Sequence, residues 1–246
     1  MRFLMLVRAT PDVAPADAGA LLAADRLLPR SKGVRVRYAG GAVEVSDPPD
    51  DPATPSISGY WLVEAESKDA AVEWAKRVAL REGEVEIRPL FELDDFPVDP
   101  AETPDGWRRK EEEFRAAPAP ARRPGTIRYM GLLKADADTE AGVMPDETLL
   151  TAMGAFIEAG VKAGVILSGE GLQPSAKGVR VRYSGNKRTV LDGPFAETKE
   201  LVAGYAIIQA ASKAEAIEWT KRFVTVDAPG RHRQESECEI LEIVER

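Results

Sequence analysis

The chain has 246 residues, of which 44% are apolar and 30% are charged, and its formal net charge is −8. This composition is typical of a globular protein with an apolar core, and it excludes a disordered or fibrous chain. The negative charge argues against direct contact with nucleic acid, because phosphate binding needs a basic surface. Neither a membrane span of roughly 20 apolar residues nor a signal peptide is predicted, so we expect a cytoplasmic protein without membrane contact.

Two parts of the chain resemble each other. The string Val34–Tyr38 (VRVRY) recurs as Val179–Tyr183, and residues 13–77 match residues 158–222 at 27 of 65 positions without a gap. This predicts a tandem duplication. We expect one unit at residues 1–93 and a second at 127–246, joined by a charged, proline-rich linker at 94–126.

The first copy is shorter than the second. Met1–Val7 resembles Ile127–Leu133 at a different offset, so about 19 residues are missing from the first copy. The missing piece corresponds to an amphipathic helix of the second copy. Residues 16–22 retain a turn of helix at most.

Within the linker, residues 107–115 predict a short helix with Trp107 and Phe114 on one face. That face would dock on a domain of this chain or on a partner. Nucleic-acid binding by the basic residues 108–110 is disfavoured, because three glutamates follow them.

The second copy carries the clearer pattern of elements. Strands are predicted at 128–134, 165–167, 179–183, 188–191, 202–210 and 239–244, with a hairpin turn at 184–187. Helices are predicted at 146–163 and from a Ser212 N-cap to about residue 223, where Glu215 completes a capping box.

This order predicts an α+β fold of the ferredoxin-like type with an inserted hairpin. The helices would cover one face of each antiparallel sheet, and the other apolar face must be buried against a second sheet. We therefore expect two ferredoxin-like units whose sheets pack face to face as an internal pseudo-dimer, in a monomer or a higher homo-oligomer.

Asp192–Glu200 reads DGPFAETKE. This string resembles the signature of the DGPF branch of the YCII-related superfamily, strongly over 127–246 and weakly over 1–93. The further elements that carry the resemblance are Tyr129-Met130, Gly169–Leu172 followed by Pro174, Val179-Arg180, Gly204-Tyr205 and Glu218-Trp219.

The resemblance implies a bacterial protein with a dimeric α/β-barrel fold. It also implies an association with extracytoplasmic-function sigma factors, whereas no reaction is established for the branch. Wider relatives include isomerase-like and lyase-like enzymes. Founding members of the family are thought to use a His–Asp pair, but His232, the single histidine, does not fall on their histidine position.

The signature is retained in the second copy only. Gly193 corresponds to Pro48 and Phe195 to Asp50 in the first copy. We therefore expect any pocket to lie in the second half, with the first half as a packing partner.

Candidate catalytic residues are Asp192 and Glu170, which the predicted fold places at neighbouring strand ends. Two carboxylates of different burial can divide acid and base roles. Arg180 or Arg182 would hold an anionic substrate, and Phe195 would form an apolar wall.

The same residues also have structural interpretations. Gly193 and Pro194 are candidate ligand-binding residues. The structural alternative is that Asp192, Gly193 and Pro194 form a turn, since these residue types favour turns. Phe195 could belong to the core, and Glu197, Lys199 and Glu200 could form a solvated salt-bridge edge.

Metal and cofactor chemistry is not expected. One histidine and one cysteine, Cys238, exclude a disulfide framework and a cysteine-rich zinc site. Cys238 is expected to be a buried, inert thiol, and His232 to lie in a surface loop. No phosphate loop, nucleotide fingerprint or metal-ligand spacing is present.

The sequence thus predicts a protein that binds a small molecule, anionic if the arginines hold it, in its second half. Cofactor-free lyase or isomerase chemistry is an extension of this hypothesis. The alternatives are a regulatory protein associated with a sigma factor and a scaffold without a site.

Overall fold

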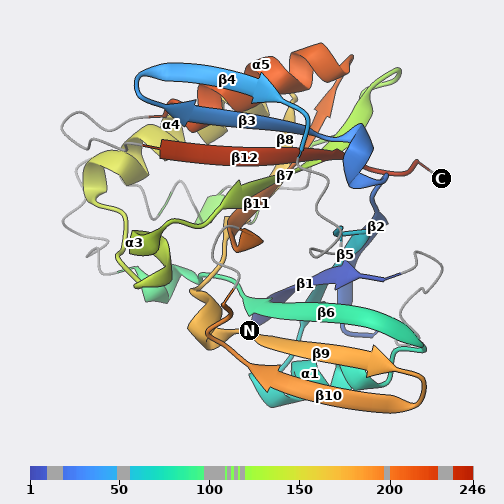
Figure 1. The fold of residues 1–246 in the computed structure, drawn as a ribbon. Helices are drawn as coiled ribbons and strands as arrows, with labels where there is room; N and C mark the ends of the chain where they lie inside the picture. Colours follow the sequence, from blue (N-terminus) through green and yellow to red (C-terminus); the bar gives the residue numbers. More distant parts are fainter. Residues whose placement is uncertain are drawn as a thin grey trace.

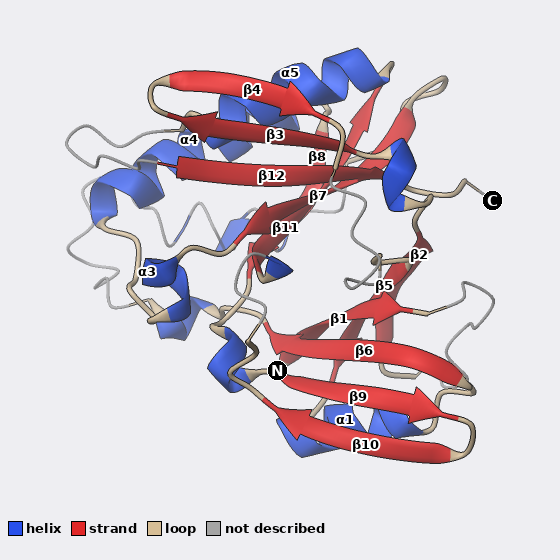
Figure 2. Ribbon diagram, in the orientation of Figure 1, coloured by secondary structure: helices blue, strands red, loops and turns tan. Residues whose placement is uncertain are grey.

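The computed structural model describes residues 1–9, 19–48, 56–96, 120–196, 200–226 and 235–245, with residues 109, 112, 113 and 116 between them. Two six-stranded antiparallel sheets are packed together, and the longer helices lie on their outer sides (Figures 1 and 2). The predicted α+β class with two packed antiparallel sheets is confirmed. Among the described residues, no helix has the length and apolar character needed to cross a membrane.

Within residues 1–96, the part that the structure describes supplies six strands and one helix. They are β1 (Arg2–Arg8), β2 (Leu21–Arg26), β3 (Val34–Ala39), β4 (Ala42–Ser46), β5 (Gly59–Glu64), α1 (Lys68–Lys76) and β6 (Glu82–Pro89). Short 3-10 turns occur at Arg30–Lys32 and Leu93–Asp95.

The described residues of the C-terminal half, 120–245, form six strands and three helices. They are β7 (Ile127–Lys134), α3 (Ala137–Glu140), α4 (Glu147–Lys162), β8 (Ile166–Gly171), β9 (Val179–Ser184), β10 (Lys187–Asp192), β11 (Val202–Ala210), α5 (Lys213–Val224) and β12 (Glu235–Glu242). A 3-10 turn, Ser175–Lys177, precedes β9.

The two halves exchange a hairpin. The β1 sheet has the order β10-β9-β6-β1-β5-β2, and the β7 sheet has the order β4-β3-β12-β7-β11-β8. In Figure 1 the blue β3–β4 hairpin therefore lies beside red β12, and the orange β9–β10 hairpin lies beside green β6. Each sheet is built from both halves of the chain.

Alternating charges stabilise the exchanged pairs. Across β9 and β6, Arg180 lies opposite Glu86, and Arg182 lies opposite Glu84. The β3–β12 pair repeats the arrangement, with arginines opposite glutamates at two alternate positions. Opposite charges facing each other across neighbouring strands favour this register.

Successive side chains of a strand point to opposite faces of its sheet, and the buried side chains accordingly form three apolar cores. Leu4 and Leu6 of β1 pack with Met130 and Leu132 of β7 in a core between the sheets. The alternate residues of these strands face outward, toward α1 on the β1 sheet and toward α4 and α5 on the β7 sheet. The predicted burial of one sheet face by another sheet thus matches the inter-sheet core.

Most predicted elements of the second half agree with the structure within one or two residues. The predicted helix starts are confirmed by their caps: Asp146 accepts a hydrogen bond from the Leu149 amide at 2.9 Å, and Ser212 from the Glu215 amide at 3.2 Å. Two strands are longer than expected, because β8 continues through a glycine-rich run to Gly171 and β12 begins at Glu235.

Candidate functional site

A cavity of about 300 Å³ lies between α4 and the outer face of the β7 sheet. We call it the α4 pocket. Its lining comes from the α3–α4 connection, α4, α5, strands β7, β8, β11 and β12, and the segment after β6. The residues that define it are Gly131, Leu133, Met144, Leu149, Leu150, Met153, Phe156, Ile157, Ile166, Ala206, Ile208, Trp219, Phe223, Cys238, Phe91 and Phe96.

Small residues in the strands create the floor of the pocket. Gly131 of β7 lies opposite Ala206 of β11. A Cβ atom at Gly131 would make an ordinary van der Waals contact with the Cys238 Sγ at 3.5 Å, so a side chain can be placed at this glycine without a clash. Such space within a packed interior is uncommon and costs stability.

Helix α4 forms the roof, but its apolar face is incompletely covered. Leu149 and Leu150 at its start are buried, whereas Met153, Phe156 and Ile157 further along are only half-buried. A helix that leaves large apolar side chains partly uncovered over a sheet is typical of a pocket wall.

The equivalent place in the β1 sheet is filled. There Met5 of β1 lies opposite Trp61 of β5, and both side chains are buried. The Trp61 ring meets the Trp74 ring of α1 edge to face, with centroids 5.7 Å apart. Large side chains thus occupy the space that Gly131 and Ala206 leave open.

Glu170 is the charged residue in the lining, but its carboxylate lies on the other side of the sheet. It pairs across the strands with Tyr205, which belongs to the inter-sheet core. Its Oε1 atom accepts a hydrogen bond from Arg2 Nη1 at 2.6 Å. Burial lowers the pKa of Arg2, but its bonds to Glu92 and Glu170 outweigh this and raise it, so the guanidinium stays charged.

The thiol of Cys238 borders the pocket without being reactive. Burial raises its pKa to about 12, and the side chain is almost fully enclosed. A neutral thiol is a poor nucleophile. The expectation of a buried, inert cysteine is in line with this environment.

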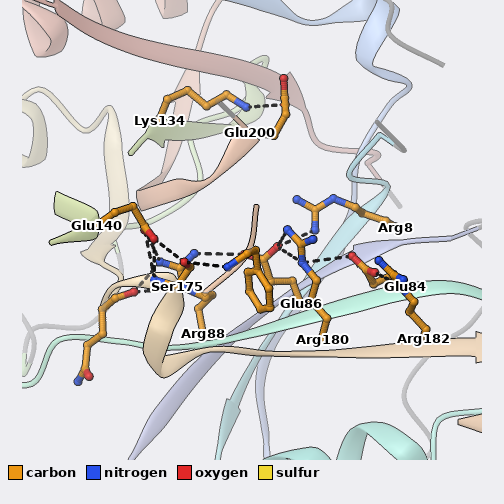
Figure 3. Close-up of polar contacts among 12 residues, drawn as sticks. Arg8, Glu84, Glu86, Arg88, Lys134, Glu140, Ser175, Arg180, Arg182 and Glu200 are labelled. Atoms are coloured by element: carbon orange, nitrogen blue, oxygen red, sulfur yellow. Dashed lines mark hydrogen bonds and ion pairs between the residues drawn. The ribbon is translucent and has the colours of Figure 1, made fainter. Parts of the chain in front are cut away.

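A second feature is a cluster of buried charges around Glu86 in the β1 sheet (Figure 3). Three arginines donate to this carboxylate: Arg8 at 3.1 Å, Arg88 at 3.2 Å and Arg180 at 3.0 Å. Burial alone would raise the pKa of Glu86, but the three arginine charges outweigh it and hold the pKa below its ordinary value. We call this group the Glu86 cluster.

Arg180 and Phe195, both predicted site residues, meet beside the Glu86 cluster. The Arg180 guanidinium lies 4.0 Å from the centre of the Phe195 ring, and both side chains are buried. The Phe195 amide donates to Ser175 Oγ at 3.4 Å, and Ser175 in turn bonds the carboxylate of Glu140. Because Arg180 donates to the buried carboxylate of Glu86, its contacts here stabilise the folded structure.

Gly193 and Pro194 belong to the loop that covers the Ser175 turn. The Gly193 amide donates to the Gly178 carbonyl at 3.1 Å. A Cβ atom at position 193 would lie 1.9 Å from the Ser175 carbonyl oxygen, so only glycine fits there. Close backbone packing accounts for this part of the signature, and Pro194 is exposed.

The predicted proximity of Asp192 and Glu170 is wrong. Asp192 ends β10 in the β1 sheet, whereas Glu170 lies in β8 of the β7 sheet, because the exchanged hairpin carries Asp192 away. The Asp192 side chain is 76% exposed and faces Lys68 at 3.5 Å. Arg182 is also exposed and donates to Glu84 at 2.7 Å. The catalytic and binding roles of these residues stay predictions.

Glu200, at the end of the signature, is half-buried rather than solvated. Lys134 donates to it at 3.1 Å, as Figure 3 shows, and Arg30 also donates to it at 3.1 Å. A polar cavity of about 480 Å³ opens beside it, with Arg35 and Glu237 in its lining. Arg35 and Glu237 form an ion pair with each other at 3.1 Å.

Several predicted features lie outside the described residues. They are Glu197, Lys199, His232 and the Trp107–Phe114 face of the linker helix. In the part of the chain that the structure describes, no three histidine, cysteine or acidic side chains are arranged to hold a metal ion.

Sequence reasoning missed the α4 pocket as a set of residues, although it placed a pocket in the second half. The available signal was the contrast between Gly131 and Met5, and between Ala206 and Trp61, at aligned positions of the two halves of the sequence. A large side chain in one repeat and a small one in the other indicates unfilled space.

Comparison with known proteins identifies a domain but not an activity. Residues 127–233 match the YCII-related domain, so the C-terminal half contains a domain of this kind. The chain is also 34% identical over 76 residues to an uncharacterised protein of Rhizobium meliloti (strain 1021). This alignment takes in 31% of the chain and 61% of that relative, so it spans about three fifths of the relative's length.

Proposed function

We propose that this protein binds a small molecule in the α4 pocket, within its YCII-related domain. The observation that carries the proposal is the difference between two equivalent places in the two sheets. Gly131 and Ala206 leave a cavity of about 300 Å³ in the β7 sheet, while Met5 and Trp61 fill the same place in the β1 sheet. A volume of this size is at the lower end of small-molecule sites.

The proposal includes the origin of this difference. We infer that the chain arose by tandem duplication of a DGPF-type unit and forms an internal pseudo-dimer. The matching strand orders of the two sheets and the reciprocal hairpins support this history. One copy then kept the binding pocket, and the other lost its first long helix and serves as a packing partner.

Binding rather than catalysis is the function that this geometry favours. The two carboxylates considered for acid and base roles, Asp192 and Glu170, lie in different sheets. Arg180 and Phe195 are engaged with the Glu86 cluster, away from the α4 pocket. An acid–base mechanism needs its groups within hydrogen-bond reach of one substrate.

The test is a fragment screen by thermal shift on the wild type and on Gly131→Met. The methionine reproduces Met5 of the other sheet and should fill the pocket, since Cβ fits at Gly131 without a clash. Fragments that raise the Tm of the wild type should leave that of Gly131→Met unchanged. Val190→Met, which adds the same side chain on the exposed strand β10, should respond as the wild type does.

If the fragments stabilise Gly131→Met as much as the wild type, their binding site is elsewhere and the proposal is wrong. Absence of any stabilising fragment would contradict it equally.

A further inference from the structure

The side chains of the α4 pocket restrict the chemistry of its ligand. We infer that the ligand is an uncharged aromatic molecule about the size of two fused rings. This inference rests on the proposed function and adds the ligand class to it. Three observations carry it: the charge of the lining, its aromatic content and its volume.

The lining offers no counter-charge to an ion. Among the described residues around the pocket there is no arginine, lysine or histidine. Glu170 directs its carboxylate to Arg2 on the inter-sheet side. An ion transferred into such surroundings would lose its hydration without gaining a partner, and the cost is several kcal/mol. The anionic ligand anticipated from Arg180 and Arg182 is therefore disfavoured for this pocket.

Two groups of aromatic side chains line the pocket. In one group Phe156 meets Trp219 edge to face, with centroids 6.0 Å apart, and also packs on Phe223 at 5.7 Å. In the other group Phe91 packs on Phe96 at 5.6 Å. Aromatic side chains in the lining favour an aromatic guest over a saturated one of the same shape.

The volume sets the size of the guest. A dry apolar cavity of about 150 Å³ binds benzene, and the α4 pocket has about 300 Å³. A molecule of two fused rings matches this space. The wall of half-buried Met153 and Ile157 supplies the apolar contacts for its faces.

Three probes that share one carbon skeleton test the inference by isothermal titration calorimetry at pH 7. They are 2-naphthol, its saturated analogue decahydro-2-naphthol, and the anion 2-naphthoate. For the wild type we expect a Kd for 2-naphthol at least about tenfold below that of 2-naphthoate. The Kd for decahydro-2-naphthol should exceed that of 2-naphthol about threefold or more.

Two variants that fill the pocket show where the probes bind. Gly131→Met and Ala206→Trp each reproduce one residue of the filled β1 sheet, so one can replace the other if either fails to fold. Both should abolish 2-naphthol binding, and Val190→Met should retain it.

The outcomes separate the two proposals. Equal or tighter binding of 2-naphthoate or decahydro-2-naphthol, lost in Gly131→Met, would overturn the ligand class and leave the pocket's function standing. The same holds if no naphthalene probe binds while screened fragments do so in a Gly131→Met-sensitive way. Binding of 2-naphthol that both filling variants retain would contradict the ligand class and the site together.

Discussion

Arg128 and Asp25 form a bidentate ion pair, in which the Nη1–Oδ2 and Nη2–Oδ1 distances are each 2.9 Å. The pair joins β7 of one sheet to β2 of the other. In a second ion pair the arginine belongs to the β1 sheet and the acid to the β7 sheet: Arg2 of β1 donates to Glu170 of β8 at 2.6 Å. The two bridges are reciprocal, and together with the exchanged hairpins they tie the halves of the chain together.

Breaking the first bridge should destabilise the fold. Asp25→Ala leaves the Arg128 charge half-buried and removes the acceptor of the Tyr60 hydroxyl, which lies 2.9 Å from Asp25. We expect a loss of about 2–3 kcal/mol in the free energy of unfolding, measured by urea denaturation. The exposed pair Arg37–Glu235 is the control, because Arg37→Ala should cost only about 0.5 kcal/mol. Equal effects of the two substitutions would contradict a structural role for the bridge.

The Glu86 cluster should make stability sensitive to acid. Because the arginines hold the pKa of Glu86 below its ordinary value of 4.5, the folded state binds fewer protons than the unfolded state in this range. The contribution is complete above pH 4.5 and is lost as the pH falls through the lower pKa of the folded state.

Glu86→Gln tests this linkage. It should cost about 3–5 kcal/mol at pH 7, since three arginines then face one another without their carboxylate. Its free energy of unfolding should also change less than that of the wild type between pH 4.5 and the pH where the wild type unfolds. Parallel pH profiles of the two proteins would show that Glu86 does not carry the effect.

The signature loop is expected to depend on Gly193 and not on Asp192. Gly193→Ala places Cβ against the Ser175 carbonyl and should cost about 2 kcal/mol or more, as overpacking does. Asp192→Asn removes an exposed charge 3.5 Å from Lys68 and should cost at most about 0.5 kcal/mol. Thermal unfolding of both variants provides the test. Similar small decreases in Tm for the two variants would show that the loop is not closely packed at Gly193.

Filling the α4 pocket should raise stability. Gly131→Met removes the entropic cost of a strand glycine and buries apolar surface, so we expect a gain of about 1 kcal/mol or more. The reverse change in the other sheet, Met5→Gly, should cost at least about 2 kcal/mol, because Met5 is fully buried. A stability loss in Gly131→Met would mean that the space beneath α4 is not available to a side chain.

The exchanged hairpins predict that residues 127–246 do not form a folded monomer. Without β6, the β9–β10 hairpin loses its neighbouring strand, and β12 loses β3. Analytical ultracentrifugation and circular dichroism of this fragment should show an unfolded chain or a self-associated one. Adding residues 1–93 should restore a one-to-one complex. A folded, monomeric fragment would contradict the reciprocal exchange.

The sequence predicted the elements of the second half well, because apolar periodicity is strong there and the caps Asp146 and Ser212 follow standard chemistry. It missed the beginning of β12, since Glu235 and Glu237 carry no apolar signal. These glutamates lie in a strand because Arg37 and Arg35 of β3 face them. The partner that explains this strand is some 200 residues away in the chain.

The exchange itself could not be derived from the sequence. The string VRVRY occurs in both halves of the chain, and so does a strand of alternating glutamates, Glu84–Glu86 and Glu237–Glu239. Each arginine strand therefore fits either glutamate strand equally well by charge and period. Since the pairing decides where Asp192 and Arg180 lie, the predicted cluster of site residues depended on a choice that local patterns do not contain.

Xenon binding in a crystal shows whether the α4 pocket is an open apolar cavity, because xenon enters dry apolar cavities and reports their position. We expect xenon between Gly131 and Phe156 in the wild type, none beside Met5 and Trp61, and none in crystals of Gly131→Met. A wild-type crystal without xenon in the α4 pocket, or with equal occupancy at the two equivalent places, would contradict this expectation.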